Sequence, residues 1–462
     1  MLFSSITFLY YFLPIVLVLY AVVPKQFKNF ILFLASLVFY AWGEPKYVFL
    51  MLLSIGIGYL AGMLMEKLPK KPVMLVAVFL CLAFLIYFKY TNFFIDNINA
   101  FLKDDIPALN VIMPIGISFY TFQIISYILD VYYGKVEKQK NILYLATYIA
   151  MFPQLIAGPI VRYSDINEQL GKRSHSSEKI ADGIRRFVLG LSKKVLIANQ
   201  LGELCQVFQN AEEKTVAFYW LYAVAAALHI YFDFSGYSDM AIGLGKLFGF
   251  DFIENFNYPY MSKSITEFWR RWHMSLGTWF RDYVYIPLGG NRCGFKRQIF
   301  NICVVWFLTG FWHGAQWNFI IWGIYFAILL IVEKLWLYNK LKHSVVFSRI
   351  YTLFFILISF VIFNMNSVGE IGFYLKNMFF LGGSQVIGAE FLYYLKSYGW
   401  ILLIAIIGAT DLPKKIYGKC RKISVPDRCL VIVEPLVLVA LLLLCTAYLV
   451  DGSFNPFLYF RF

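Results

Sequence analysis

Long apolar runs recur along this chain of 462 residues, and their length limits the possible folds more than any other feature of the sequence. An α-helix needs about 20 apolar residues to cross the hydrocarbon core of a bilayer, because each residue adds about 1.5 Å to the helix. Hydrophobic residues make up 60% of the chain and charged residues 15%, whereas soluble proteins carry about 25% charged residues. The sequence therefore predicts an all-α polytopic membrane protein and argues against a water-soluble globule.

The apolar runs predict about 11 or more transmembrane helices. The spans are expected near residues 3–23, 28–43, 47–66, 73–95, 108–131, 185–208, 215–248, 298–337, 346–364, 387–409 and 429–450, and the longer stretches are expected to bend or to lie partly at the interface. The first run has no basic flank and no small-residue cleavage site, so we interpret it as a retained span. No fixed-period repeat or low-complexity linker divides the chain, so residues 1–462 are expected to form a single integral domain.

Positive charge alternates between successive loops over the first five spans. The lysine clusters are Lys25 and Lys28, then Lys67, Lys70 and Lys71, then Lys135, Lys138 and Lys140. Loops rich in lysine and arginine stay on the cytoplasmic side of the membrane. We therefore expect an extracytoplasmic N-terminus in the cell (plasma or inner) membrane. Residues 411–428 carry the strongest cytoplasmic signal of the C-terminal half.

The net charge of +14 is spread over short basic clusters between apolar runs. A nucleic-acid-binding protein would gather such charge into one stripe or patch, so the pattern favours topology and lipid contact instead. Seven cysteines occur without a CxxC pair or regular spacing. They predict buried thiols and neither a disulfide framework nor a metal site.

One apolar stretch is interrupted by helix breakers. "NILYLATYIAMFPQLIAGPIVRY" contains Pro153 and then Gly158 and Pro159. Breaks at membrane depth persist only where protein or a watery cavity satisfies the freed backbone groups. The pattern predicts a broken or re-entrant element here.

A polar segment, "WRRWHMSLGTWFRDYVYIPLGGNR", follows at 269–292. Its apolar residues recur at helical spacing at Trp269, Trp272, Leu276, Trp279 and Tyr283. The spacing predicts one amphipathic helix that begins after a capping Ser264, ends near Pro287 and carries His273 and Arg281 on another face. An interfacial helix with snorkelling arginines and a catalytic element both fit this pattern.

A second histidine, His313, lies near the middle of a long apolar segment. Thr309 and Gln316 are expected to share its helix face, and Gly310 and Gly314 to form a small-xxx-small contact. An ionisable group that faces lipid costs at least about 2.5 kcal/mol, so His313 should face the interior or a cavity. We therefore predict a functional role, since imidazole exchanges protons near neutral pH.

A third polar group is the HxxxD pair of His229 and Asp233. The spacing places both on one helix face but is a weak signal by itself. We interpret His229 as structural and Asp233 as a cavity carboxylate that needs a partner.

Taken together, these motifs resemble the membrane-bound O-acyltransferase superfamily. The resemblance rests on two motifs, "FWRRWHMSLGTWFRDYVYIPLGGNR" and "LTGFWHGAQWNFIIWGIYF". The first contains His273 and the second contains His313, 40 residues later. The stretches "NFILFLASLVFYAWGEPKY", "MPIGISFYTFQIISYILDVYYG", "FPQLIAGPIVRY", "FDFSGYSDMAIGLGKLFGFDFIENFNYPY" and "NPFLYFRF" are similar to the branch that O-acetylates alginate and other exopolysaccharides. The D-alanyl-lipoteichoic acid branch shares much of the central block.

The resemblance implies a ring of helices around a funnel, through which an acyl group passes from a cytoplasmic donor to an extracellular acceptor. It assigns His313 and His273 as catalytic. Residues expected to line the substrate cavity are Asp233, Trp272, Arg281, Asp282, Thr309, Gln316 and Trp317. His313 is the expected base for the acceptor hydroxyl, and His273 is expected to orient it, bind the donor or stabilise an oxyanion.

No tightly bound cofactor is expected, only a co-substrate such as acetyl-CoA or an acyl carrier. The resemblance also implies an extracytoplasmic, esterase-like polysaccharide O-acetyltransferase as partner. Two alternatives remain open at this point: D-alanyl transfer from a carrier protein toward lipoteichoic acid, and a transporter or flippase without transferase activity.

Overall fold

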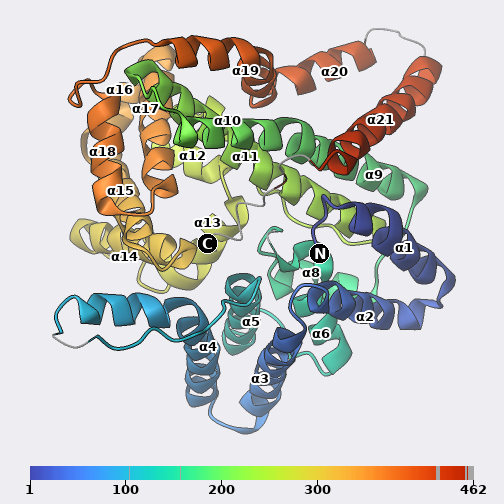
Figure 1. The fold of residues 1–462 in the computed structure, drawn as a ribbon. Helices are drawn as coiled ribbons and strands as arrows, with labels where there is room; N and C mark the ends of the chain where they lie inside the picture. The colour runs from blue at the N-terminus through green and yellow to red at the C-terminus, as the bar shows by residue number, and fades with distance from the viewer. Residues whose placement is uncertain (103–104, 157, 423–426, 453–454, 456–462) are drawn as a thin grey trace. The chain divides into compact units, whose positions relative to one another are not determined.

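The computed structural model of the protein describes residues 1–102, 105–156, 158–422, 427–452 and 455 (Figure 1). The described residues form helices and connecting turns, with no β-strand among them. The predicted all-α fold class is therefore confirmed. Two compact units are present, one formed by residues 1–187 and 238–254 and the other by residues 188–237 and 255–462, and each is described by itself. Of the terminal "NPFLYFRF" motif, only Asn455 lies within the described residues.

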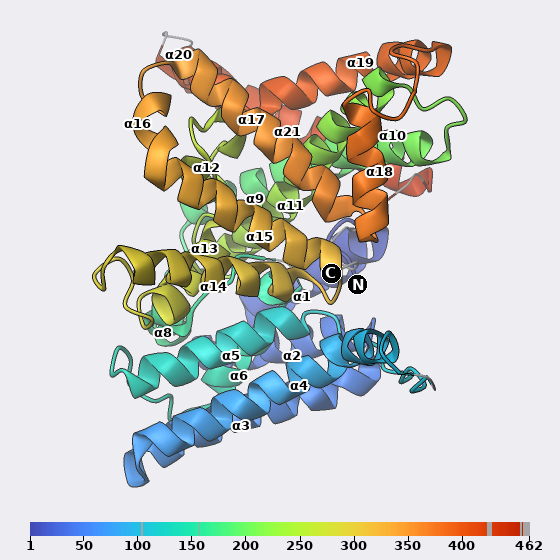
Figure 2. The ribbon, with the colours of Figure 1, turned by 90° about the vertical axis from the view of Figure 1, so that its left-hand side faces the viewer.

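The first unit contains the N-terminal helices. They are α1 (Leu13–Val22, after a π-helical turn at Phe8–Phe12), α2 (Lys28–Ala41), α3 (Val48–Lys67), α4 (Lys70–Asn99), α5 (Ile117–Tyr132), α6 (Ile142–Ala150), α7 (Phe152–Leu155), α8 (Tyr163–Gly171) and most of α9 (Ser177–Ser192). Helices α3, α4 and α5 pack side by side (Figure 2). Gly58 and Gly62 of α3 face Ile124 and Tyr127 of α5 so closely that larger side chains would clash.

Helix α5 begins later than the sequence predicts. The span was expected from residue 108, but residues 105–114 are not helical and α5 starts only after Gly116. Gly116 adopts a left-handed φ of 75°, and a Cβ there would lie 2.7 Å from the Leu155 carbonyl oxygen. This backbone contact requires glycine and ends the non-helical entry segment.

The predicted break in the 141–163 stretch is confirmed, and it lies at Met151, between α6 and α7. The polar groups that the break frees are satisfied inside the unit. The Phe152 amide donates to Ser36 Oγ at 3.0 Å, and Gln154 Nε2 donates to the Tyr148 carbonyl. A helix can thus be interrupted within an apolar environment because neighbouring side chains replace its lost hydrogen bonds.

The second unit contains the remaining helices. They are a π-helical segment at Lys193–Ala198, α10 (Asn199–Asn210), α11 (Val216–Leu247, up to residue 237), α12 (Ile265–Arg271), α13 (Met274–Phe280), α14 (Phe295–His313), α15 (Trp317–Val332), α16 (Tyr338–Leu341), α17 (Val345–Asn364), α18 (Val368–Met378), α19 (Ala389–Gly408), α20 (Leu412–Lys422) and α21 (Asp427–Val450). Helices α14 and α15 pack extensively against each other. Their contact centres on Gly310 and Gly323, where a Cβ on either residue would meet the opposite backbone.

Within the described ranges, seven helices are long and apolar enough to cross a membrane. They are Pro45–Lys67, Lys70–Asn99, Val216–Leu247, Trp317–Leu341, Val345–Asn364, Ala389–Gly408 and Ile432–Val450. The multi-pass character is confirmed. Several expected spans, α2 and α5 among them, are shorter than about 20 residues, so the number of about 11 stays a prediction.

Candidate active site

His313 is the last residue of α14, and the helix does not continue through it as the sequence predicted. Gly314 follows in an extended conformation, and α15 begins at Trp317. A Cβ at Gly314 would collide with the Phe319 ring, so the chain can turn sharply here only with glycine. The expectation that Gln316 continues the polar helix face of His313 is therefore wrong. The close helix contact expected at the small-xxx-small pair is made by Gly310, which packs against Gly323 of α15, whereas Gly314 lies just beyond the end of α14.

The His313 imidazole is surrounded by aromatic rings. Its exposed fraction is 7%. The ring centroid lies 5.0 Å from Trp312, 5.1 Å from Trp322 and 5.4 Å from Phe363, each in an edge-on arrangement. Such walls exclude water and hold the ring in a defined orientation.

His273 connects two helices that the sequence predicted as one. Helix α12 ends at Arg271, α13 begins at Met274, and His273 between them has a left-handed φ of 44°. The start of α12 is as predicted, because Ser264 Oγ accepts from the Glu267 amide at 3.0 Å. The continuous amphipathic helix is wrong because the backbone turns at the histidine, where Met274 N donates to the Asn255 carbonyl at 3.0 Å.

The hydrogen bonds of His273 define its tautomer. Asn255 Oδ1 accepts from the Ser275 amide at 3.2 Å and from Ser275 Oγ at 2.9 Å, so this atom is an acceptor. His273 Nδ1 lies 3.2 Å from the same oxygen and therefore donates its proton to it. Burial lowers the pKa of His273 to about 3, so its ring is neutral at pH 7. The free lone pair is then on Nε2, which has no hydrogen-bond partner in the described part of the chain.

Trp312 contacts both histidines. Its ring centroid lies 6.1 Å from that of His273 and 5.0 Å from that of His313. Phe234 of α11 packs edge-on against His273 at 4.7 Å. The structure thus brings the two predicted catalytic residues to one aromatic cluster, although 40 residues separate them.

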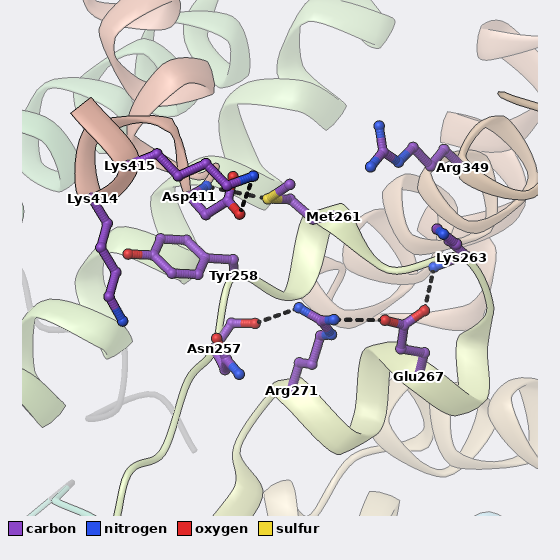
Figure 3. Close-up of a pocket in the computed structure, with 10 residues that line it drawn as sticks. All are labelled: Asn257, Tyr258, Met261, Lys263, Glu267, Arg271, Arg349, Asp411, Lys414 and Lys415. Carbon is purple, nitrogen blue, oxygen red and sulfur yellow. Dashed lines mark hydrogen bonds and ion pairs between the residues drawn. The ribbon is translucent and has the colours of Figure 1, made fainter. Parts of the chain in front are cut away.

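A basic cavity of about 680 Å³ lies next to the segment that carries His273 (Figure 3). It is lined by Asn257, Tyr258, Met261, Lys263, Glu267, Arg271, Arg349, Asp411, Lys414 and Lys415. Arg271 bonds Glu267 at 2.7 Å, and Lys415 bonds Asp411 at 2.8 Å. These two ion pairs leave the positive charges of Lys263, Arg349 and Lys414 uncompensated by the lining. The cavity wall is tied to the histidine segment, because Asn257 N donates to the Arg271 carbonyl at 2.9 Å.

The other predicted cavity residues take up different environments. Thr309 is buried one turn before His313 and donates to the Val305 carbonyl at 2.7 Å. Trp272 packs among aromatic rings, including Phe268 and Phe256. Gln316 and Trp317 are exposed at the start of α15. Their roles toward substrate stay predictions.

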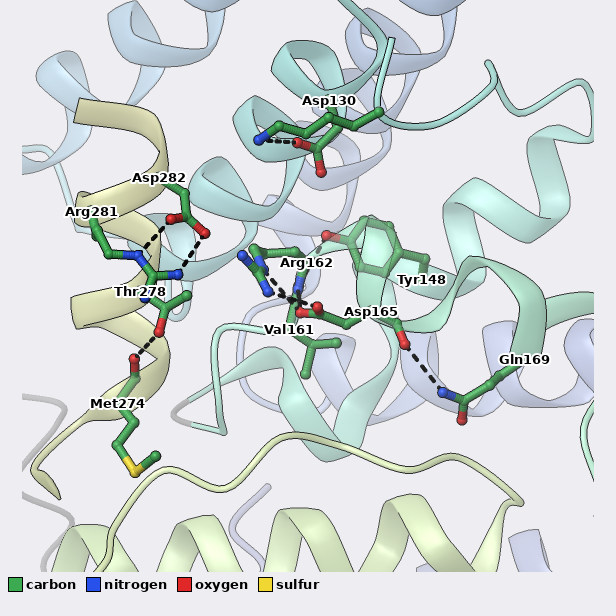
Figure 4. Close-up of polar contacts among 11 residues, drawn as sticks. Asp130, Tyr148, Val161, Arg162, Asp165, Gln169, Met274, Thr278, Arg281 and Asp282 are labelled. Atoms are coloured by element: carbon green, nitrogen blue, oxygen red, sulfur yellow. Dashed lines mark hydrogen bonds and ion pairs between the residues drawn. The ribbon is translucent and has the colours of Figure 1, made fainter. Parts of the chain in front are cut away.

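Arg281 and Asp282 bind each other where α13 passes into a π-helical turn at Arg281–Tyr285. Figure 4 shows the pair, with Arg281 Nε 2.7 Å from Asp282 Oδ1, and Thr278 Oγ1 donating to the Met274 carbonyl one turn earlier. The Arg281 side chain is mostly exposed. An exposed guanidinium with a neighbouring carboxylate is suited to contact a polar ligand, but it also fits the snorkelling alternative.

Asp233 has the partner that the sequence analysis required, and the partner is Lys194. Lys194 Nζ lies 2.5 Å from Asp233 Oδ1, with 1% and 3% of the two side chains exposed. Lys194 belongs to the π-helical segment, and Gly236 packs against the Gly190 carbonyl and the Lys194 amide beside it. π-Helical turns inside α-helices often occur at functional sites.

Sequence reasoning missed three residues of this region. Asn255 and Ser275 hold His273, and Lys194 neutralises Asp233. For Asn255 the sequence offered one signal, a polar residue within the aromatic run "NFNYPY". Lys194 lies in the middle of the expected span 185–208, where a charged residue indicates a buried partner, but the sequence does not show which residue that partner is.

Comparison with known proteins decides the family. The model of the membrane-bound O-acyltransferase family, MBOAT, matches residues 135–369, the region that contains both histidines. The chain belongs to this family. A probable alginate O-acetylase of Azotobacter vinelandii is 44% identical over 346 residues, covering 72% of this chain and 69% of the relative. A peptidoglycan O-acetyltransferase of Helicobacter pylori is 33% identical over 424 residues, which cover 83% of this chain and 80% of the relative. A teichoic acid D-alanyltransferase of Bacillus subtilis is 32% identical over 236 residues, which cover 48% of this chain and 60% of the relative.

Membership of the MBOAT family confirms the resemblance that the motifs indicated. The protein is a multi-pass membrane O-acyltransferase. The transporter or flippase without transferase activity is thereby set aside. The catalytic roles of His313 and His273 are not tested by the comparisons and remain predictions.

The hydrogen bond from His273 to Asn255 gives a first testable prediction. Replacing Asn255 by leucine removes the acceptor that orients the ring, and a misplacement of about 1 Å in an active site costs about 10²-fold in rate. We expect Asn255→Leu to lower kcat for acyl transfer by about this factor. Asn255→Asp keeps an oxygen at this position and should retain more activity. Equal losses in both variants, measured at equal protein amounts, would contradict an orienting role.

Proposed function

We propose that this MBOAT protein transfers an acetyl group from a cytoplasmic thioester donor, across the cell membrane, for the O-acetylation of an extracytoplasmic polysaccharide. The observation that carries the proposal is the buried His313, which shares one aromatic cluster with a neutral, oriented His273. The relatives named as alginate and peptidoglycan O-acetylating enzymes support acetate as the group and a polysaccharide as the acceptor.

In this proposal His313 is the general base. An acceptor hydroxyl gives its proton to the imidazole while its oxygen attacks the acyl carbonyl carbon. The carbon–sulfur bond of the thioester then breaks, and the departing thiolate takes the proton from the imidazolium. The aromatic walls around His313 support this role, because they protect the donor from hydrolysis.

His273 would contact the donor as a hydrogen-bond acceptor. Its Nδ1 proton is used by Asn255, and a neutral ring has no second proton to offer an oxyanion. Of the three roles that the sequence left open, the tautomer therefore supports hydrogen bonding to an N–H or O–H group of the donor.

The basic cavity beside His273 would hold the phosphates of the donor. Lys263, Arg349 and Lys414 offer positive charge there, and Arg271 lies two residues before His273. Acetyl-CoA carries such phosphates, and so does the prosthetic group of an acyl carrier protein. Asp411, Lys414 and Lys415 of this cavity belong to the segment 411–428, which is expected to face the cytoplasm. In the same orientation the N-terminus would be extracytoplasmic.

The acetyl group would pass on through an extracytoplasmic, esterase-like polysaccharide O-acetyltransferase as partner. D-Alanyl transfer is the alternative, and it has weaker support because the D-alanyltransferase relative matches only 48% of the chain.

Transfer from a labelled donor tests the proposal. Membranes containing the protein should move label from acetyl-CoA to base-labile esters on the polysaccharide. Release of D-alanine by mild base, with no acetate, would favour the alternative. The Lys263→Gln/Lys414→Gln variant should raise KM for acetyl-CoA at an unchanged kcat if the cavity holds its phosphates. Exposed Lys342, outside this cavity, supplies the matched control Lys342→Gln.

A further inference from the structure

A second basic cavity lies in the first compact unit. It has a volume of about 460 Å³ and is lined by Lys25, Lys28, Asn29, Tyr144, Leu170, Gly171, Lys172, Arg173, Ser174 and His175. None of these ten residues is acidic. Four of them carry full positive charges, and none of the four forms an ion pair within the part of the chain that the structure describes. Uncompensated cations in a concave site repel one another unless an anion joins them.

Arg173 is held rigidly in this cavity by neutral groups. Its Nε donates to Tyr20 Oη at 2.7 Å, and its Nη1 donates to Asn29 Oδ1 at 2.5 Å. The guanidinium also lies 4.6 Å from the centroid of the Phe250 ring. Its buried Nη2 has no hydrogen-bond partner among the described residues. The arginine is therefore oriented in advance while its charge remains available.

The surroundings of Lys28 and His175 also indicate a positive potential in the cavity. Lys28 Nζ lies 4.5 Å from the centroid of the Tyr20 ring, a cation–π contact that leaves its charge without a carboxylate among the described residues. Burial, followed by the charges of Lys28 and Arg173, lowers the pKa of His175. His175 Nε2 lies 3.1 Å from Tyr20 Oη, at the edge of the same network.

We propose that this cavity binds the phosphate group of an anionic phospholipid. Arg173 Nη2 is the nitrogen left to donate to a phosphate oxygen, and the lysines add point charges around it. A lipid is favoured over a soluble phosphate because apolar side chains flank the site on the outer surface of the unit. Val22 and Phe27, beside Lys25 and Lys28 in the chain, are 79% and 50% exposed. The residues that line this cavity belong to the first compact unit, and the residues proposed for acyl transfer belong to the second.

Binding to lipids of defined charge tests the proposal. The full chain in detergent is titrated with phosphatidylglycerol or with phosphatidylcholine, and bound lipid is counted by native mass spectrometry. We expect phosphatidylglycerol to bind more tightly, and each removed charge to weaken it by about fivefold. Lys28→Gln tests the charge without removing a hydrogen bond that holds the fold, and Arg173→Gln tests the oriented group. Lys70→Gln/Lys71→Gln, in another predicted cytoplasmic cluster, is the matched control.

The possible outcomes separate the sources of phosphate. Weaker binding in the Lys28 and Arg173 variants, with an unchanged control, supports the proposal. Binding of inorganic phosphate or adenosine 3′,5′-bisphosphate through these residues, without a preference for phosphatidylglycerol, would overturn the lipid assignment. Equal weakening in all variants would show that only general charge matters and would overturn the site itself.

Discussion

Replacing His313 by glutamine is expected to lower acyl transfer by about 10²–10⁴-fold, the usual contribution of a positioned general base. Glutamine can fill much of the space beside Trp322 and Phe363 and can form hydrogen bonds, but it cannot take a proton from a hydroxyl. The loss should therefore appear in kcat while the protein remains folded in the membrane. The measurement is the rate of ester formation from a labelled thioester, normalised to the amount of protein.

A histidine outside the site supplies the control for this variant. His343 follows α16 and is exposed, so His343→Gln should leave the transfer rate unchanged. Near-wild-type transfer by the His313 variant would remove the proposed base from the mechanism. Loss of the protein from the membrane would instead show that the imidazole is needed for folding.

The second large effect is expected at the buried ion pair of Lys194 and Asp233. Removing one partner of a buried pair leaves the other charge uncompensated and costs about 3–5 kcal/mol. Lys194→Met and Asp233→Leu should each lower the stability of the detergent-solubilised protein by about this amount. The double variant should recover most of the loss, because both charges are then absent. Thermal unfolding of all four proteins, followed by size-exclusion chromatography, measures the coupling.

Additive losses in the double variant would contradict this account of the pair. Recovery of stability without recovery of transfer would have a different meaning. It would show that the pair also serves the reaction, as its position in a π-helical segment allows.

The sequence predicted the helical class and the family, because these depend on composition and on local motifs, and the catalytic roles of the two histidines stay predictions. It did not predict the turns at the histidines themselves. Residues 268–283 keep helical spacing throughout, so periodicity alone predicts one helix. The left-handed backbone at His273 depends on Asn255, which lies 18 residues earlier. Such a tertiary contact overrides local propensity and leaves no trace in the spacing.

The ion pair of Lys194 shows the same limit in another form. Lys194 lies in the middle of the expected span 185–208, where a charged residue needs a partner, but only packing of α11 against the π-helical segment places it beside Asp233. Long-range pairing of charges follows from the fold, so one sequence by itself cannot indicate it.

The end of α14 at His313 has an electrostatic consequence for the proposed reaction. The final carbonyl groups of a helix point along its axis and carry partial negative charge, which favours a cation close to the last turn. As a hydroxyl gives up its proton, the imidazole becomes positively charged at this position. The backbone dipoles of a 19-residue helix then help to hold that charge in a setting from which water is excluded, so stopping the helix at the histidine makes the main chain part of the catalyst.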